Sequence, residues 1–458
     1  MTRMTKPEDM SQDAVAGAQP CLAGIDPGKE IYALASELYP VCRSITGDGV
    51  RTTLDILERH IPLERHELPT GTKVLDWEIP REWNIADAYI KDADGNRQVD
   101  FRQSNLHVLN YCTPIHRRMD LDALRPHIVT LPDQPELIPY RTSYYADAWG
   151  FCMSQNQLAV LDSIGGEFEV CIDSTLEDGA LTWGEYLHRG EIADEILLST
   201  HICHPSLAND NCSGLALQTI LAKLLSGRTT RYSYRFLFVP GTIGAIAWLS
   251  QNDATVQHIK HGLVLSCVGD PGGPTYKKSR RGNAPIDRAM GQVLCRPGLK
   301  PKVIDFFPYG YDERQYCSPG FDLPVGLFQR SQFGTFPEYH TSADNLSFIS
   351  AAALGESFRW IAEALDILER ERTYLNLNPK GEPQLGRRGL YASVGGDKDA
   401  AQHNMAMLWV LNLSDGSHSL LDIAERSKLP FDTIAAAADA LHDHGLLADT
   451  GAGGCGAE

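Results

Sequence analysis

The fold is decided by the stretch His201-Ile-Cys-His204-Pro-Ser-Leu-Ala-Asn-Asp210-Asn-Cys-Ser-Gly214, which stands between two apolar runs. The run before it, Glu195–Thr200, is typical of a buried strand, and the run after it, Leu215–Leu225, is typical of a helix. Two imidazoles and a carboxylate are therefore expected where a strand ends and a helix begins. In α/β sheets this edge collects ligands and catalytic groups. Histidine and aspartate are also ligands that catalytic zinc accepts.

Strands and helices alternate in the region that follows. The further elements are Tyr234–Val239 with the helix Ile243–Gln251, the strand Gly262–Cys267, and Leu323–Leu327 with the helix Ala351–Glu371. Such alternation predicts an α/β fold with a mostly parallel sheet sandwiched by helices. Because parallel strands end on one edge of a sheet, polar residues that follow different strands are expected to meet there.

Changes in composition and in the pattern of apolar runs divide the chain into four parts. Residues 1–27 are polar, without an apolar segment suited to secretion, and predict a disordered tail. Residues 28–62 and 191–375 make up the α/β domain. Residues 63–190 hold short runs such as Gln157–Leu161 and Phe168–Ile172, broken by Pro, Gly and Asp, which predicts an inserted all-β domain that covers the site as a lid. Residues 385–458 predict a winged helix.

Composition limits the classes of partner. The net charge of −18 over 458 residues argues against nucleic acid or an anionic membrane. No apolar run approaches the roughly 20 residues that span a bilayer. The 11 cysteines lack paired spacing and suit a reducing compartment, so a cytoplasmic protein is expected. Residues 401–458 hold two basic residues, Arg426 and Lys428, against eight acidic ones, which favours a structural or partner-binding winged helix over DNA binding.

Other segments at or near strand ends carry polar side chains. They are Asp270, then Tyr311-Asp312-Glu313-Arg314, and then Glu338-Tyr339-His340-Thr341 with Asp344. A catalytic zinc takes about three protein ligands and leaves a position for water. His201, Asp210 and His340 would supply that set.

Some assignments stay open at this point. Asp312 or Glu313 could hold another cation or orient a substrate amine, so that Asp312 joins the expected metal ligands. Asp344 could instead cap the helix that follows it, and Asp210 could cap Leu215–Leu225.

The same residues carry a family resemblance. His201 followed nine residues later by Asp210, with a late Tyr339-His340-Thr341, resembles the metal-binding signature of zinc aminopeptidases with co-catalytic metals. The chain is more similar to a bacterial aminopeptidase-like family, at Arg43-Ser-Ile-Thr-Gly, Ile202-Cys-His-Pro-Ser, Ser266-Cys-Val-Gly-Asp, Asp312-Glu-Arg-Gln-Tyr and Phe336-Pro-Glu-Tyr-His-Thr-Ser-Ala-Asp-Asn. The resemblance covers about residues 28–450. It implies a zinc aminopeptidase-like α/β domain, an inserted β domain and a C-terminal winged helix, with zinc at His201, Asp210 and His340, as one ion or two.

One departure from the family bears on the chemistry. Zinc aminopeptidases have a Glu-Glu pair after the second strand, and the aminopeptidase-like family has Pro-Glu-Thr-Ile-Gly, but this chain reads Pro240-Gly241-Thr242-Ile243-Gly244. Gly241 therefore lacks the side chain of the general base, and Thr242 stands in place of one expected metal ligand. General-base assistance typically raises the rate of such a reaction about 10²–10⁴-fold. The expected replacements are Glu313, Glu338 and His204. Cys203 also stands where an aspartate usually orients a ligand.

These observations predict a zinc-dependent, aminopeptidase-like hydrolase that acts on a small peptide or amide, with weakened or altered activity. Arg43, Arg314 and Tyr339 are the expected substrate-binding residues. The alternative is a non-hydrolytic member that keeps zinc for another step in a biosynthetic pathway. A DNA-binding regulator is disfavoured by the acidic C-terminal unit. Homo-oligomerisation stays open.

Overall fold

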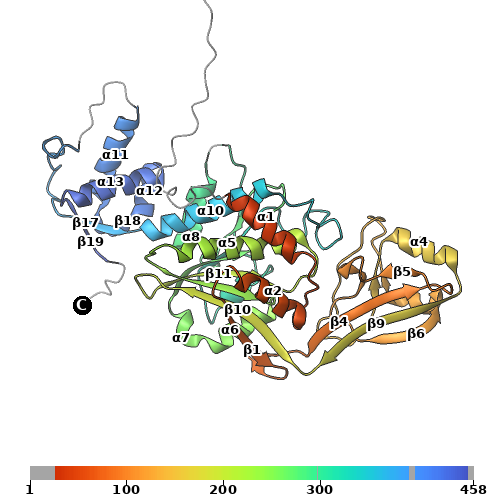
Figure 1. The fold of residues 1–458 in the computed structure, drawn as a ribbon. Coiled ribbons are helices and arrows are strands. Elements are labelled where there is room, and N and C mark those ends of the chain that lie inside the picture. Colours follow the sequence, from red (N-terminus) through yellow and green to blue (C-terminus); the bar gives the residue numbers. More distant parts are fainter. Residues whose placement is uncertain (1–25, 297, 391–397, 452–458) are drawn as a thin grey trace, which may run out of the picture.

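A mixed sheet of eight strands forms the centre of the molecule, and a smaller domain is attached on either side of it (Figure 1). The structure, a computed structural model, describes residues 26–296, 298–390 and 398–451. Of the tail expected over residues 1–27, residues 1–25 lie outside these ranges, and Pro27 already begins the first helix. No helix within the described ranges has the length and apolar character needed to cross a membrane.

Four parallel strands make the middle of the sheet, in the order β12-β11-β13-β16. Their bounds are Ser233–Val239 (β12), Glu195–His201 (β11), Ile259–Leu265 (β13) and Val325–Gln329 (β16). Every residue of β11 and β12 is buried, as expected for strands that helices cover on both faces. Further strands extend the sheet: β1 (Glu64–Pro69) and β10 (Ala180–His188) beyond β12, and β14 (Thr275–Lys277) and β15 (Lys302–Ile304) beyond β16. The predicted α/β fold is confirmed.

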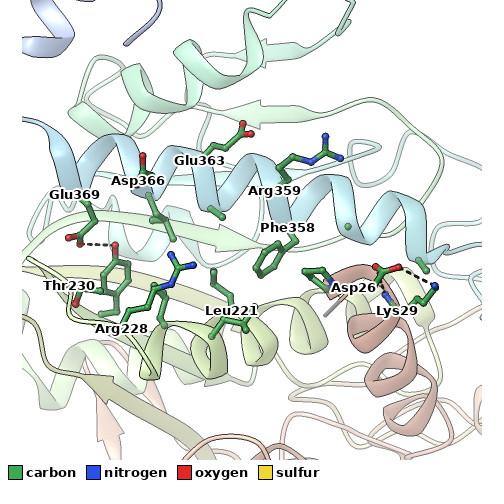
Figure 2. A pocket seen from close by; sticks show the side chains of 18 of the residues that line it. Asp26, Lys29, Leu221, Arg228, Thr230, Phe358, Arg359, Glu363, Asp366 and Glu369 are labelled. Atoms are coloured by element: carbon green, nitrogen blue, oxygen red, sulfur yellow. Dashed lines mark hydrogen bonds and ion pairs between the residues drawn. The ribbon is translucent and has the colours of Figure 1, made fainter. Parts of the chain in front are cut away.

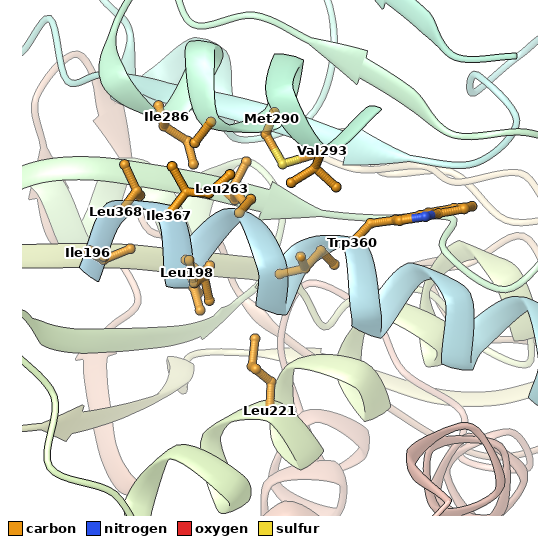
Figure 3. Packing of buried hydrophobic residues seen from close by; sticks show 14 of the residues in the cluster. Ile196, Leu198, Leu221, Leu263, Ile286, Met290, Val293, Trp360, Ile367 and Leu368 are labelled. Atoms are coloured by element: carbon orange, nitrogen blue, oxygen red, sulfur yellow. The ribbon is translucent and has the colours of Figure 1, made fainter. Parts of the chain in front are cut away.

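Helices cover both faces because alternate residues of a strand point to opposite sides of the sheet. Ile196 and Leu198 of β11 pack in one layer, where Leu221 is also buried, and Leu197 packs in the other. Figure 3 shows the first layer between the strands and its helices. That layer holds α1 (Pro27–Leu38), α2 (Asp48–Glu58), α5 (Gly214–Ser226), α8 (Pro285–Leu294) and α10 (Ala351–Arg370). The second holds α6 (Ile243–Gln251), α7 (Asp253–Val256) and α9 (Glu313–Tyr316).

A groove of about 770 Å³ lies between α5 and α10, near the start of α1 (Figure 2). Its apolar wall residues include Leu221, Leu224 and Leu225 of α5 and Phe358 and Leu365 of α10. Leu221, Leu224 and Leu225 belong to the C-terminal half of α5. The stretch that carries His201, His204 and Asp210 precedes the N-terminus of that helix, at its other end. None of the residues expected to bind metal or substrate lines this groove.

The inserted domain is shorter than predicted and is not all-β. β1 and β10 belong to the large sheet, so residues 70–179 between them form the separate domain, not residues 63–190. Gln157–Leu161, expected as an extended run, lies in the helix α4 (Gln155–Ile164) because Ser154 and Gln157 form a capping box at its start. The domain's main sheet has the order β5 (Arg97–Asp100), β4 (Glu82–Lys91), β9 (Glu167–Glu177) and β6 (Ile115–Asp120). Short elements complete it: β2 (Lys73–Val74), β3 (Trp77–Glu78), α3 (Leu121–Leu124), β7 (Ile128–Val129) and β8 (Phe151–Cys152).

The C-terminal unit is a winged helix, as predicted. Its elements are β17 (Thr373–Asn376), α11 (Lys398–Leu413), β18 (Asp415–Ser419), α12 (Leu420–Ser427), α13 (Phe431–Asp443) and β19 (Leu447–Asp449). β17 is the middle strand of its sheet, so the unit begins near residue 373 and not at 385. Arg288 of α8 forms ion pairs of 2.8 Å with Asp422 and Glu425 of α12, which dock the unit on the α/β domain. The last residues of the predicted range, 452–458, lie outside the described part of the chain.

Candidate metal centre

Three histidines surround one aspartate where β11 ends. The Nε2 atom of His201 lies 2.8 Å from Oδ1 of Asp210, and Nε2 of His340 lies 3.0 Å from Oδ2 of the same carboxylate. Nε2 of His204 lies 4.0 Å from Oδ2. His201 and Asp210 are almost completely shielded from solvent. The structure therefore brings together the three residues that the sequence nominated for zinc, and adds His204 to them.

The loop that carries Asp210 is held by side chains from other strand ends. Asp344 accepts hydrogen bonds from the backbone N–H groups of Asn209 (2.6 Å) and Asp210 (3.0 Å). Asn209 donates through Nδ2 to Asp270, which also accepts from the N–H and Oγ of Ser331. Asp344 is thus an anchor of the loop that carries Asp210, not the helix cap that was considered for it; Ser350 caps α10 instead.

The inserted domain reaches this centre through a loop that pairs with the loop carrying His340. The N–H of Tyr140 donates to the carbonyl of His340 (2.8 Å), and the N–H of Ser342 donates to the carbonyl of Ile138 (2.8 Å). The ring of Tyr140 contacts both His204 and His340, with centroids 5.1 and 5.0 Å apart. The insertion therefore forms part of the wall of the site.

Two more tyrosines stack on the metal-ligand candidates. The ring of Tyr339 lies 3.9 Å from that of His340, and the ring of Tyr311 lies 4.8 Å from that of His201, both nearly parallel. The sequence indicated Tyr339 but gave Tyr311 and Tyr140 no role. Tyr140 lies more than sixty residues before the cluster, and its aromatic neighbours in the insertion were the one signal that could have suggested it.

The electrostatics of the cluster suit a metal ion. Burial alone would raise the pKa of Asp210, but its interactions with His204, His201 and His340 outweigh burial and hold that pKa well below its usual range. Burial lowers the pKa of His204 well below its ordinary value, which favours the neutral imidazole. An ionised carboxylate and neutral imidazoles are the forms that bind zinc. Ligand atoms of His201, His204 and Asp210 all lie within 4.8 Å of one another, so the donor set fits a zinc ion.

The acidic segment at the start of α9 lies beside the cluster but does not join it. Asp312 is fully buried, and neither of its carboxylate oxygens has a hydrogen-bond partner among the described residues. Glu313 forms a fully buried ion pair of 2.7 Å with Lys277. Arg314 is half-buried, and its Nε has no partner within the described ranges. Three adjacent residues thus have three different environments.

Arg43 does not face a substrate position, contrary to the sequence prediction. It is fully buried, and its guanidinium donates to the carbonyl oxygens of His204 (2.8 Å) and Leu38 (2.8 Å) and to Sγ of Cys212 (3.0 Å). The polar, glycine-bearing loop around it suggested exposure, but the loop is packed against the loop that carries Asp210. Arg43 therefore braces the backbone of His204 from behind.

Glu338 and Cys203, two further residues considered for the site, differ in their exposure to solvent. Glu338 is half-exposed, and the N–H of Thr341 donates to its backbone carbonyl (3.1 Å). The Sγ of Cys203 lies 3.5 Å from Nδ1 of His204, inside the site. Burial raises the pKa of the Cys203 thiol to about 12, so this thiol is protonated at neutral pH and is no nucleophile.

Comparison with known families settles which family this is. Residues 32–371 match the family described as "Domain of unknown function (DUF4910)". The chain belongs to this family. Residues 372–449 of this DUF4910 protein match a winged helix-turn-helix family, in agreement with the observed C-terminal unit.

Relatives of this DUF4910 protein share its aminopeptidase-like architecture. A protein of Clostridium acetobutylicum is 53% identical over 420 residues, 92% of this chain and 96% of its own; its name provisionally assigns it to polysaccharide biosynthesis, with an aminopeptidase-like domain. A crystal structure from Clostridium acetobutylicum, provisionally described as a peptidase, is 52% identical with a TM-score of 0.88, and covers 92% of this chain and 96% of that one. A zinc aminopeptidase of Bacillus subtilis shares the fold alone, at 12% identity, a TM-score of 0.53, and 74% and 94% coverage. The predicted aminopeptidase-like family is confirmed.

Proposed function

We propose that this protein is a zinc-dependent hydrolase of the aminopeptidase type that cleaves a small peptide or amide. The observation that carries the proposal is Asp210, a buried carboxylate with an imidazole at each oxygen, at the carboxyl edge of a parallel sheet. The aminopeptidase-like fold supports a hydrolytic reaction. The histidine and aspartate donors support zinc over a harder cation.

His201, Asp210 and His340 would hold the metal, and His204 would complete or share the set. Zinc bound there would polarise the substrate carbonyl and lower the pKa of a bound water to about 7. Asp344 keeps Asp210 in register through two backbone N–H groups, so the donors need little rearrangement on metal binding.

The walls of the site favour a small substrate. Rings of Tyr140, Tyr311 and Tyr339 contact the three histidines and restrict the space beside them. Tyr339 can bind substrate from its stacked position on His340. Arg314 remains the candidate for a substrate carboxylate, because it is half-buried beside the cluster and its Nε has no partner among the described residues.

Zinc analysis of purified protein, combined with assays on amino-acid amides and dipeptides, tests the proposal. We expect bound zinc, hydrolysis of at least one small amide, loss of both with a chelator, and recovery on zinc addition. His340→Ala should lose zinc, whereas His258→Ala, a change at an exposed histidine outside the cluster, should retain it. Protein that neither contains zinc nor is stabilised by it against heat would contradict the proposal.

A second candidate function is a zinc-binding protein that performs a different step in a biosynthetic pathway. Gly241, which lacks the side chain of a general base, favours it, and so does the biosynthetic name of the Clostridium acetobutylicum relative. Full zinc occupancy without hydrolysis of any amide or peptide in the panel would favour this candidate over the first.

We further propose that the protein acts in the cytoplasm and that its winged helix does not bind nucleic acid. The exposed side of α13 carries Asp432, Asp439 and Asp443, which would repel phosphates. Salt-sensitive binding to mixed-sequence DNA would contradict this part of the proposal.

A further inference from the structure

Gly241 lies between the metal cluster and a buried carboxylate. Gly241 follows β12 and is half-buried. A Cβ atom built on it would lie 3.2 Å from Cβ of His201 and 3.5 and 3.8 Å from Oδ1 and Oδ2 of Asp312. A single side-chain position therefore separates the Asp312 carboxylate from a residue of the metal cluster.

Asp312 differs from the other buried carboxylates at this edge of the sheet. Asp210 has imidazoles, Asp344 has two backbone N–H donors, and Glu313 has Lys277. Neither oxygen of Asp312 has a partner in the part of the chain that the structure describes. Burying an unpaired carboxylate is costly, so such a group is expected to interact with something that the protein chain itself does not supply.

We propose that Asp312 is the general base of this site and takes the place of the side chain that Gly241 lacks. The inference rests on the proposed hydrolytic function. In the reaction, Asp312 accepts a proton from the attacking water, and the water oxygen bonds to the substrate's carbonyl carbon. The bond between that carbon and the amide nitrogen then breaks, and the proton passes from Asp312 to the leaving nitrogen.

The other expected bases are less well placed. The carboxylate of Glu313 is bound to Lys277 in a fully buried pair, and the hydrogen bonds of Glu338 among the described residues involve only its backbone carbonyl. His204 is buried among the metal-ligand candidates. The glycine is also explained, because a glutamate at position 241 would bring a second carboxylate next to Asp312, and two buried like charges disfavour each other.

The first test is Asp312→Asn in the full-length, zinc-loaded protein. We expect the turnover number to fall about 10²–10⁴-fold, with the zinc content unchanged. Asp305→Asn, at a mostly exposed aspartate just before this segment, is the matched control and should retain turnover. Normal turnover in Asp312→Asn would overturn the inference. Loss of zinc in that variant would also overturn it, because Asp312 would then be a metal ligand.

The second test moves the carboxylate from position 312 to position 241. Gly241→Glu combined with Asp312→Asn should recover about tenfold or more of the turnover that Asp312→Asn loses, because a carboxylate again faces the same space. Gly241→Glu alone should not exceed the unchanged protein, because it pairs two carboxylates. A single Gly241→Glu variant that is faster, or a double variant that shows no recovery, would count against Asp312 as the base.

A third measurement separates this inference from the proposed function. Acetohydroxamic acid, a small zinc-binding acid, should release a proton on binding to the zinc-loaded protein. Difference infrared spectra recorded above pH 8, where the Asp312 carboxyl is ionised before binding, should then show a protonated carboxyl band that Asp312→Asn removes. If the protein hydrolyses nothing but the band is present, the proposed function fails and the role of Asp312 as proton acceptor stands. If the band is absent, or persists in Asp312→Asn, the inference about Asp312 fails.

Discussion

Asp210 and Asp312 lie at the same edge of one sheet, and both side chains are fully buried. Asp210 is met by an imidazole at each oxygen, and the histidines hold its pKa well below the usual range in spite of burial. Asp312 has no partner among the described residues, and burial together with Glu313 raises its pKa to about 8. Asp210 is thus kept ionised, as a zinc ligand would need to be, and Asp312, once ionised, is the stronger base of the two. The neighbours of each aspartate alone thus give two identical side chains different pKa values and different roles.

Asp210→Asn is the variant that we expect to have the largest effect on zinc binding. An amide cannot supply the ionised oxygens that zinc requires, so we expect zinc affinity to fall by more than the roughly 10–100-fold that an outer partner contributes. Competition with a chelating dye would measure it. Asp312→Asn should leave zinc affinity unchanged. If the two variants lost zinc equally, the division of roles would be wrong.

Asp344→Asn tests whether the position of Asp210 depends on its anchor. The substitution weakens the acceptor for the N–H groups of Asn209 and Asp210. We expect zinc affinity to fall about 10–100-fold, as for other residues that orient a metal ligand. Glu338→Gln, in the same loop, is the control. It should retain both zinc and turnover, and a loss of turnover there would revive Glu338 as the base.

Arg43→Met should have a smaller effect, and mainly on stability. It removes the donor to the carbonyl of His204, and leaving a buried acceptor unpaired costs about 1–3 kcal/mol. Urea unfolding would measure this loss, and zinc affinity should fall less than in Asp344→Asn. A variant with normal stability and weakened substrate binding would instead restore Arg43 as a substrate residue.

Glu371 offers the mildest test, because it is a half-buried carboxyl outside the cluster. Burial raises its pKa to about 7 although it accepts a hydrogen bond from the N–H of Leu421. The folded protein therefore binds this proton more tightly than the unfolded chain, where the pKa is about 4.3. Its contribution to the free energy of unfolding is fully present below pH 4 and is lost as the pH rises to 7.

Glu371→Gln should flatten that fall by on the order of 1 kcal/mol, since the residue is partly solvated. Urea unfolding at pH 5 and pH 7.5 would show it. An unchanged pH dependence would mean that burial at this position is not enough to shift a carboxyl, and would weaken the same reasoning for Asp312.

The sequence predicted the centre because its main residues follow a strand directly. His201 ends β11, Asp210 lies in the loop to α5, and the parallel order of the strands brings His340 to the same edge. This information is local, apart from the rule that parallel strands share an edge. The aminopeptidase-like resemblance then supplied the significance of Gly241.

The contacts between distant segments could not be predicted. Arg43 was interpreted from a polar, glycine-bearing loop, yet two of its acceptors, on His204 and Cys212, lie more than 160 positions away in the chain. Tyr140 reaches the histidines only because the insertion folds back over them. In the insertion, the apolar run Gln157–Leu161 fitted a strand as well as a helix, and the capping residue Ser154 was the signal that should have decided it.

The pairing between the insertion and the His340 loop bears on how the protein matures in the cell. Ile138 and Ser342, which face each other across this pairing, are separated by 204 positions in the chain. A nascent chain on the ribosome presents His201, His204 and Asp210 well before the residues that complete the centre have been synthesised. The centre is therefore complete only once residue 340 has been synthesised, and a product truncated before it would emerge with an incomplete centre, however well its sheet had formed.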